Sequence, residues 1–330
     1  MTIQFLGPPQ LIKRTPHGAP SEERISNWIS VWDGAEAIDV ALVGVAFAKG
    51  GEIALGTSST PNAIRKAFVR NTTYSHDYEV DMRDLKVRHA GDVEYHGTDI
   101  ARSHYQIESA LFDLHHVTPS PFVIALGGDG SIVAPSVRAL ARARDLRLGV
   151  IHFDGFHDVR DSAEVGPSDA TSIRTLLEEA AIAGHNLVQI GLHGFANSPA
   201  ERAYLEGHGT MVVTAREVRR EGIESVLDRA LARASDGVDG VYVSVDANVL
   251  DASNAPFSYA TSIAGLRAVD VQDAMFRLGA DRRVLAMDLV GLDTYDDPKE
   301  FMARVGVALL LAFLAGFSTR TGPTDREGGE

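Results

Sequence analysis

Acidic and histidine side chains gather directly after an apolar run near the middle of the chain. The β-branched pair Val150 and Ile151 is followed by four ligand-type residues, His152, Asp154, His157 and Asp158. A buried strand that ends in such residues is how a parallel α/β sheet presents a site, because ligands gather at the carboxyl ends of its strands. Two carboxylates held together repel each other unless a cation or a proton lies between them. The alternative, in which these acids only cap helices or face solvent, remains open on this stretch alone.

Two other predicted strands also end in acid-bearing turns. The apolar run 122–126 leads into Gly127-Gly-Asp129, and the run 241–245 leads into Asp246-Ala-Asn248. If the three strands are neighbours, their turns meet in one cleft. Clustered carboxylates with a few histidines favour Mg²⁺ or Mn²⁺, and a bound cation lowers the pKa of its water. We therefore predict that Asp154 and Asp246 lie at the same edge of one parallel sheet.

Strands and helices alternate along the whole chain, which predicts βαβ units and one mostly parallel sheet with helices on both faces. The expected strands are 37–47, 87–93, 122–126, 148–153, 187–191, 211–214, 241–245 and 283–290. The expected helices are 21–32, 59–65, 100–116, 132–144, 171–183, 199–207, 223–234, 269–279 and 297–314. We predict an N-terminal arm over 1–35, a single three-layer α/β/α domain over 36–318, and a disordered tail over 319–330.

Composition excludes several classes of function. The net charge of −14 argues against nucleic acid and against an anionic membrane surface as partners. The absence of cysteine excludes disulfides, thiolate metal sites and a cysteine nucleophile. The apolar run 305–313 is too short to span a membrane, so we expect a cytoplasmic protein. The glycine-rich loop 49–56 lacks the GxGxxG pattern, which argues against a dinucleotide-binding dehydrogenase.

Several short motifs, in order over about residues 37–318, make the chain resemble the ureohydrolase family of arginase, agmatinase, guanidinobutyrase and formimidoylglutamase. The resemblance implies an eight-stranded, mostly parallel sheet, two manganese ions at the strand ends, and a trimer or hexamer. It also implies attack of a metal-bridging hydroxide on a guanidinium or amidine carbon. The motifs are Gly56 with Pro61-Asn-Ala-Ile-Arg65, Ala90-Gly-Asp-Val93, Gly127-Gly-Asp129, the Asp154 turn, Val188-Gln-Ile-Gly191, the Asp246 turn with Ala255-Pro256, and Gly265-Leu266.

The chain departs from the family pattern at five positions that bear on the site. Gly130 and Phe156 stand where the family has metal-binding histidines, and Asn248 replaces a metal-binding aspartate. Gly291 aligns with a glutamate that contacts the guanidinium group. Asp169 aligns with a histidine that the family places before a Gly-Thr pair.

These departures are uneven. By the resemblance, the family has two metal positions that share two of the acids. One position has lost both of its unshared ligands, at Phe156 and Asn248, whereas the other retains Asp154, Asp158 and Asp246. We therefore expect at most one divalent cation, Mn²⁺ or Mg²⁺, and not a dinuclear manganese centre. His152 is the nearest replacement ligand, because residues two apart on a strand point to the same side. His157 joins the three acids as a candidate catalytic residue; for both histidines a packing role is the alternative.

Two hypotheses of function follow. In the first, the chain is a divergent hydrolase of a guanidino, ureido or amidine C–N bond, with an altered metal site that holds at most one cation. In the second, it is a non-catalytic homologue that acts in assembly or in small-molecule binding. The expected partners are a small-molecule substrate or ligand and further copies of the chain, as a trimer or hexamer, with an active paralogue as an open alternative.

Overall fold

The computed structural model describes residues 3–15, 22–51, 56–256 and 262–320. Its centre is one sheet, ordered β1-β6-β3-β7-β12-β11-β8-β9-β10, with β2 also paired to β6. The eight strands from β6 to β10 are parallel to their neighbours, and only β1 is antiparallel. The predicted mostly parallel, eight-stranded α/β sheet is therefore confirmed, with two short strands added. The strands are β1 Leu6–Gly7, β2 Ser30–Val31, β3 Val40–Gly44, β6 Val87–Val93, β7 Phe122–Leu126, β8 Leu148–Phe153, β9 Ile182–Leu192, β10 Met211–Thr214, β11 Gly240–Asp246 and β12 Val284–Val290.

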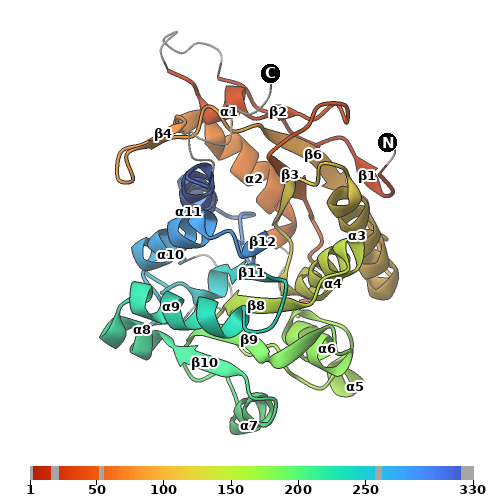
Figure 1. The fold of residues 1–330 in the computed structure, drawn as a ribbon, viewed down its shortest axis with the longest axis vertical. Helices are drawn as coiled ribbons and strands as arrows, with labels where there is room; N and C mark the ends of the chain where they lie inside the picture. Colours follow the sequence, from red (N-terminus) through yellow and green to blue (C-terminus); the bar gives the residue numbers. More distant parts are fainter. Residues whose placement is uncertain (1–2, 16–21, 52–55, 257–261, 321–330) are drawn as a thin grey trace.

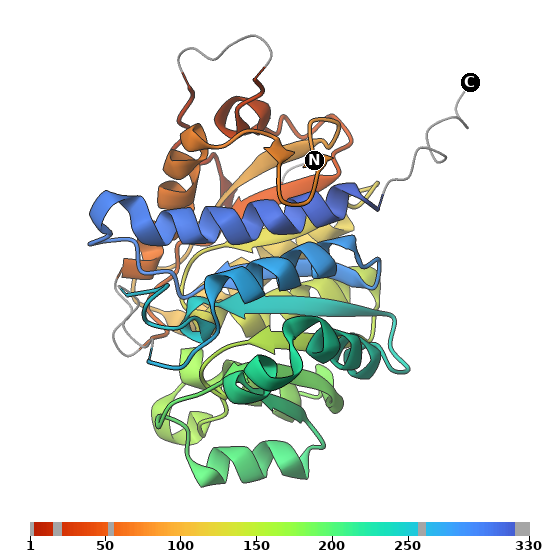
Figure 2. The ribbon, with the colours of Figure 1, turned by 90° about the vertical axis from the view of Figure 1, so that its left-hand side faces the viewer.

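Helices cover both faces of the sheet, so the chain forms three layers (Figures 1 and 2). On one face α2, α8, α9, α10 and α11 share an apolar core with the sheet. On the other, α3, α4, α6 and α7 form two further clusters. Successive side chains of β7 point to opposite faces of the sheet, so Ile124 lies in the first core and Val123 in the cluster on the other face. The helices are α2 Thr60–Ala67, α3 Ile100–His116, α4 Val133–Arg144, α6 Ser172–Glu178, α7 Pro199–Gly207, α8 Ala215–Glu221, α9 Ile223–Ala234, α10 Ala268–Ala280 and α11 Phe301–Ser318, with the short α1 Ile25–Trp28 and α5 Ser162–Val165.

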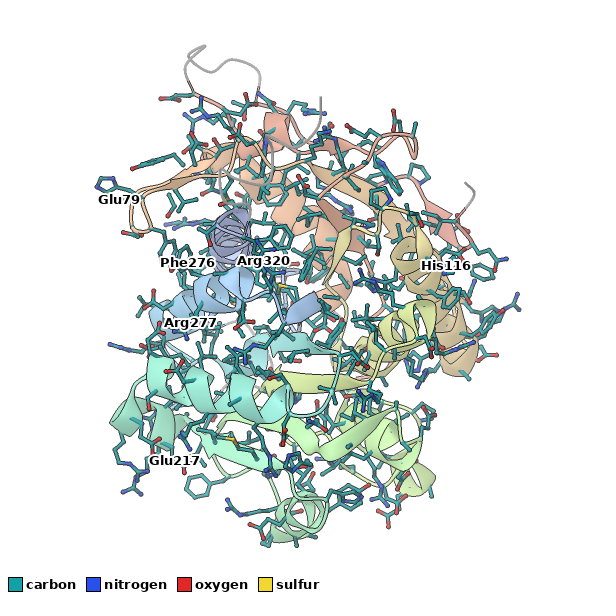
Figure 3. All side chains as sticks on the ribbon, in the orientation of Figure 1. Glu79, His116, Glu217, Phe276, Arg277 and Arg320 are labelled. Carbon is teal, nitrogen blue, oxygen red and sulfur yellow. The ribbon has the colours of Figure 1, made fainter. Side chains whose placement is uncertain are left out.

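The last helix, α11, is longer than the apolar run 305–313 suggested. Together with the turn before it, Pro298–Ser318, it is long and apolar enough to cross a membrane by length and composition, but 61% of its most apolar window is buried. It packs along α10 through close contacts at Gly279 and Gly316, where a side chain would meet the backbone of the facing helix. Arg320 follows α11 and stacks on two phenylalanine rings, and Phe276 of α10 stacks on Tyr78 (Figure 3).

The structure differs from the predicted elements in several segments. The helix expected over 171–183 ends at Glu178, because Ala180 adopts a left-handed backbone conformation (φ 52°) that turns the chain into β9. The helix expected over 21–32 is reduced to α1, because the chain extends after Ile29 into β2, which pairs with β6. The strand β1 also pairs with β6, and α8 was not predicted. Residue 21 of the expected helix 21–32 and residues 321–330 of the expected tail lie outside the described residues.

Candidate metal centre

An Asx turn, in which an aspartate accepts from the backbone N–H two residues on, follows each of three parallel strands. Asp154 after β8 accepts from the N–H of Phe156 (3.0 Å), and Asp246 at the end of β11 accepts from the N–H of Asn248 (2.7 Å). Asp129, after β7, accepts in the same way from a residue two positions on (3.0 Å). Such Asx turns are a common way for aspartate to end a strand, and each uses one carboxylate oxygen. In Asp154 and Asp246 the other oxygen is directed toward the cluster of acids described below.

Asp129 differs because both of its oxygens are engaged. Its Oδ2 accepts from the backbone N–H groups of Gly50 (2.8 Å) and Gly51 (2.9 Å). Its Oδ1 accepts from the backbone and hydroxyl of Ser131. The carboxylate therefore ties the 49–51 loop to the end of β7, which is a supporting role and not that of a ligand.

His152, Asp154 and Asp158 form a buried cluster whose candidate ligand atoms all lie within 4.8 Å of one another. The Nε2 atom of His152 is 3.4 Å from Oδ2 of Asp154 and 3.8 Å from Oδ2 of Asp158. Burial, together with the nearby His157, lowers the pKa of His152 to about 3, so the ring is neutral at physiological pH. The cluster thus combines two carboxylates with one neutral imidazole.

The acids of the site repel one another strongly. Burial, followed by Asp246 and Asp158, raises the pKa of Asp154 well above its usual range. Burial, followed by Asp169 and Asp246, does the same to the pKa of Asp158. Burial raises the pKa of Asp246 to about 7, with the charge of Asp169 adding to the effect. A divalent cation would offset this repulsion, so the donor set fits one cation.

His157, predicted as a catalytic residue, is directed toward Gln189. Its Nδ1 lies 2.7 Å from Oε1 of Gln189, whose Nε2 donates to the His157 carbonyl (2.9 Å). Asn197 accepts from the His157 N–H (3.0 Å) and donates to the carbonyl of Gly155 (2.8 Å). His157 thus holds the turn between Asp154 and Asp158, and it does not belong to the cluster with His152.

Gln189 also sets the orientation of His152. Its Nε2 faces the Nδ1 of His152 at 3.4 Å. Because the contacts to His157 fix the amide with its donor on this side, Nδ1 of His152 is the acceptor and the proton lies on Nε2. His152 therefore donates toward Asp154 and Asp158. Its Nε2 could bind a metal only if the proton moved to Nδ1 and the Gln189 amide turned to accept it. The sequence did not single out Gln189 or Asn197, although the Val188-Gln-Ile-Gly191 motif was a signal for the first.

His193 lies beside the same turn and was not among the predicted site residues. Its Nδ1 lies 2.7 Å from the carbonyl of Gly191, which fixes the proton on Nδ1 and leaves Nε2 as an acceptor. A Cβ at Gly155 would lie 3.0 Å from the ring. Glycine at residue 155 therefore permits His193 to approach the Asp154 turn.

Two of the departures from the family pattern border Asp246 directly. A Cβ built on Gly130 would lie 3.5 Å from Oδ2 of Asp246 and 3.7 Å from Oδ2 of Asp158. Gly291 has a left-handed backbone (φ 71°), and a Cβ there would overlap the Asp246 carboxylate. The backbone at residue 291 thus has no room for the family glutamate while Asp246 holds its present position.

Comparisons with known proteins agree with this geometry. Residues 38–316 match the arginase family. The chain is 37% identical to the formimidoylglutamase of Halalkalibacterium halodurans, over 86% of this chain and 89% of that protein. It is 31% identical to the formimidoylglutamase of Bacillus subtilis, over 89% and 92% of the two chains.

Solved structures show the same fold. The crystal structure of the Bacillus subtilis formimidoylglutamase superposes with a TM-score of 0.87 at 30% identity, over 92% of this chain and 94% of that one. A Trypanosoma cruzi formiminoglutamase solved with Mn²⁺ superposes with a TM-score of 0.81 at 26% identity, over 91% of this chain and 100% of that one. The fold, the position of the acid cluster at the strand ends and the extent of these matches lead to one conclusion: the chain belongs to the arginase family of ureohydrolases.

Proposed function

We propose that this protein hydrolyses a C–N bond of a linear amidine, ureido or guanidino compound, with one divalent cation, Mn²⁺ or Mg²⁺, at the strand ends. The observation that carries the proposal is the convergence of buried Asp154, Asp158 and Asp246 in an arginase fold. The relatives named formimidoylglutamase make formimidoyl amino acids the first substrates to test.

The side chains of such a site would have different roles. Asp154, Asp158 and Asp246 would hold the cation, and His152 would become a nitrogen donor only as the tautomer that carries its proton on Nδ1, which requires the Gln189 amide to turn. When bound, a divalent cation supplies Lewis-acid activation of water. His193, whose Nε2 is an acceptor beside the Asp154 turn, is placed to take up a proton. His157 positions the turn through Gln189 and Asn197.

The choice of one cation over two rests on the donor set. Phe156 offers no ligand atom at the position of a family histidine. Asn248 offers a carbonyl oxygen but no charge where the family has an aspartate. Because two divalent cations carry four positive charges, the loss of this acid and this imidazole disfavours the second ion.

Within this class, substrates that the family holds through a guanidinium group are disfavoured. Gly291 supplies no carboxylate to pair with a cationic substrate group. We therefore expect no appreciable manganese-dependent release of urea from arginine, agmatine or guanidinobutyrate. Release of urea from agmatine at roughly 1–1000 per second, the rate of an ordinary enzyme, would contradict this reasoning.

The proposal is tested by metal analysis and a substrate screen on protein purified without chelators. We expect up to one equivalent of Mn²⁺ or Mg²⁺ per chain, and turnover of a formimidoyl or ureido substrate that Asp154→Asn abolishes. Glu164→Gln, which removes an exposed acid from α5, is the matched control and should leave turnover unchanged. Two equivalents of metal, or turnover that survives Asp154→Asn, would refute the proposed site.

A non-catalytic role in assembly or ligand binding is the second candidate, and the replacements at Phe156, Asn248 and Gly291 support it. Bound metal without turnover across the substrate classes would favour this role. We further propose a cytoplasmic homo-oligomer, a trimer or hexamer, with an active paralogue as an alternative partner. Light scattering of the purified chain, alone and with the paralogue, distinguishes these assemblies.

A further inference from the structure

The glycine at residue 130 leaves an open position between three carboxylates. A Cβ built there would lie 3.5 Å from Oδ2 of Asp246, 3.7 Å from Oδ2 of Asp158 and 3.5 Å from Cβ of Asp169. The family places a metal-binding histidine at this position. In this chain the Cβ of the acid Asp169 borders the same space.

The structure holds Asp169 in place through the backbone. Asp169 begins the short 3₁₀ helix Asp169–Thr171, and its N–H donates to the carbonyl of Gly50 (3.1 Å). Gly50 is the residue whose N–H donates to Asp129, so Asp169 and the end of β7 are tied to the same loop. The Oδ1 atom of Asp169 accepts from the N–H of the next residue, Ala170 (2.7 Å).

The Cβ of Asp169 and the Oδ2 atoms of Asp158 and Asp246 thus surround one point, the position of the Cβ that Gly130 lacks. A carboxylate on a side chain that borders this point is placed to share a cation with the other two, because hard divalent cations collect oxygen ligands from several acids.

We propose that Asp169 is a further ligand of the cation and takes the place of the nitrogen ligand that is absent at residue 130. The inference rests on the proposed metal site at Asp154, Asp158 and Asp246. An oxygen ligand in place of an imidazole makes the donor set harder, so the site should select Mg²⁺ or Mn²⁺ over Co²⁺ and Zn²⁺ more strongly than a histidine-containing site does.

The test is direct metal binding to chelator-stripped protein, measured by calorimetry with Mn²⁺ as the probe and by the visible absorption of bound Co²⁺. Asp169→Asn should weaken Mn²⁺ binding by about 10-fold or more, because the loss of a residue that only supports a ligand already costs about 10-fold to 100-fold in affinity. Glu164→Gln, the nearby exposed acid, should change the Kd by less than about twofold, because exposed charges are screened.

A second variant keeps the test independent of folding losses. The Cβ of a residue at 130 would meet its neighbours only at ordinary contact distances. Gly130→His in the Asp169→Asn background should therefore recover tight binding, with the preference moved toward Co²⁺ and a changed Co²⁺ spectrum.

The outcomes separate this inference from the proposed function. If the wild type binds Mn²⁺ tightly and Asp169→Asn binds it equally well, the role of Asp169 is overturned but the proposed metal site is not. Equal losses in Asp169→Asn and Glu164→Gln would overturn it as well, because the effect would then be one of net charge. Failure of the wild type to bind Mn²⁺, Mg²⁺ or Co²⁺ would overturn the proposed metal site together with this inference.

Discussion

Replacing Asp288 with asparagine should change the stability of the protein in a pH-dependent way, more favourably at high pH than at low pH. Asp288 is fully buried on β12, where it accepts from the hydroxyls of Tyr242 (2.8 Å) and Ser244 (2.7 Å). Burial raises the pKa of this carboxyl from 3.8 to about 7, although the two hydroxyls lower it. The folded state therefore holds a proton that the unfolded state releases near pH 4.

The sign and size follow from linkage. A raised carboxyl pKa contributes stability below the unfolded pKa, and that stability is lost as the pH rises through the folded value. With pKa values of 3.8 in the unfolded state and about 7 in the folded state, this carboxyl lowers the free energy of unfolding by roughly 2 kcal/mol at pH 5.5 and by about 4 kcal/mol at pH 8. Asparagine does not titrate, so the stability of Asp288→Asn relative to wild type should rise by about 2 kcal/mol between these two pH values.

Thermal unfolding at pH 5.5 and 8 measures this change. With an unfolding entropy of about 2.1 cal/mol/K per residue over 330 residues, 2 kcal/mol corresponds to a Tm difference of about 3 °C. Glu164→Gln should show no such pH-dependent gap. A gap between Asp288→Asn and wild type that is the same at both pH values would refute the reasoning, because Asp288 would then be ionised in the folded protein throughout.

Two further predictions concern stability away from the site. Arg320→Ala should lower the free energy of unfolding by about 2–4 kcal/mol, because Arg320 donates to the carbonyls of Gly279, Leu278 and Val284 and stacks on two phenylalanine rings. Denaturant unfolding measures this loss, and Arg216→Ala, at an exposed arginine of α8, is the control. His115 is buried, and burial together with Arg144 lowers its pKa to about 3. Because folding opposes its protonation, the stability of the protein should fall as the pH drops below 6.5. His115→Leu should therefore make the Tm less dependent on pH between 6.5 and 4, and an unchanged slope would contradict this reasoning.

The sheet and most of its helices could be predicted because their apolar periodicity is strong. The strand expected over 122–126 and the helix expected over 100–116 coincide with the observed β7 and α3. The end of the helix over 171–183 could not be predicted, because Ala180 in a left-handed conformation carries no glycine or proline signal. The short strands β1 and β2 were missed because two residues show no periodicity, and pairing with β6 alone defines them.

The positions of the acids could be predicted, but the directions of the histidines could not. Strand ends in a parallel sheet share one edge, which sufficed to bring Asp154 and Asp246 together. The direction of His157 depends on Gln189 and Asn197, which come from a different strand and loop. The tautomer of His152 depends on the same glutamine. Such orientations arise from tertiary contacts, and the local sequence Asp-Gly-Phe-His-Asp does not encode them.

The two glycines that replace family side chains act on the same carboxylate. Gly130 leaves space beside Oδ2 of Asp246, and the left-handed Gly291 allows the same carboxylate to occupy the space of a side chain at residue 291. Restoring a glutamate at 291 would therefore also change the surroundings of Gly130, since it would push Asp246 from its present place. Asp169, on the open side of Gly130, is the acid that this arrangement brings toward Asp246. The departures at residues 130 and 291 thus both act on Asp246, as the proposed rearranged metal site requires.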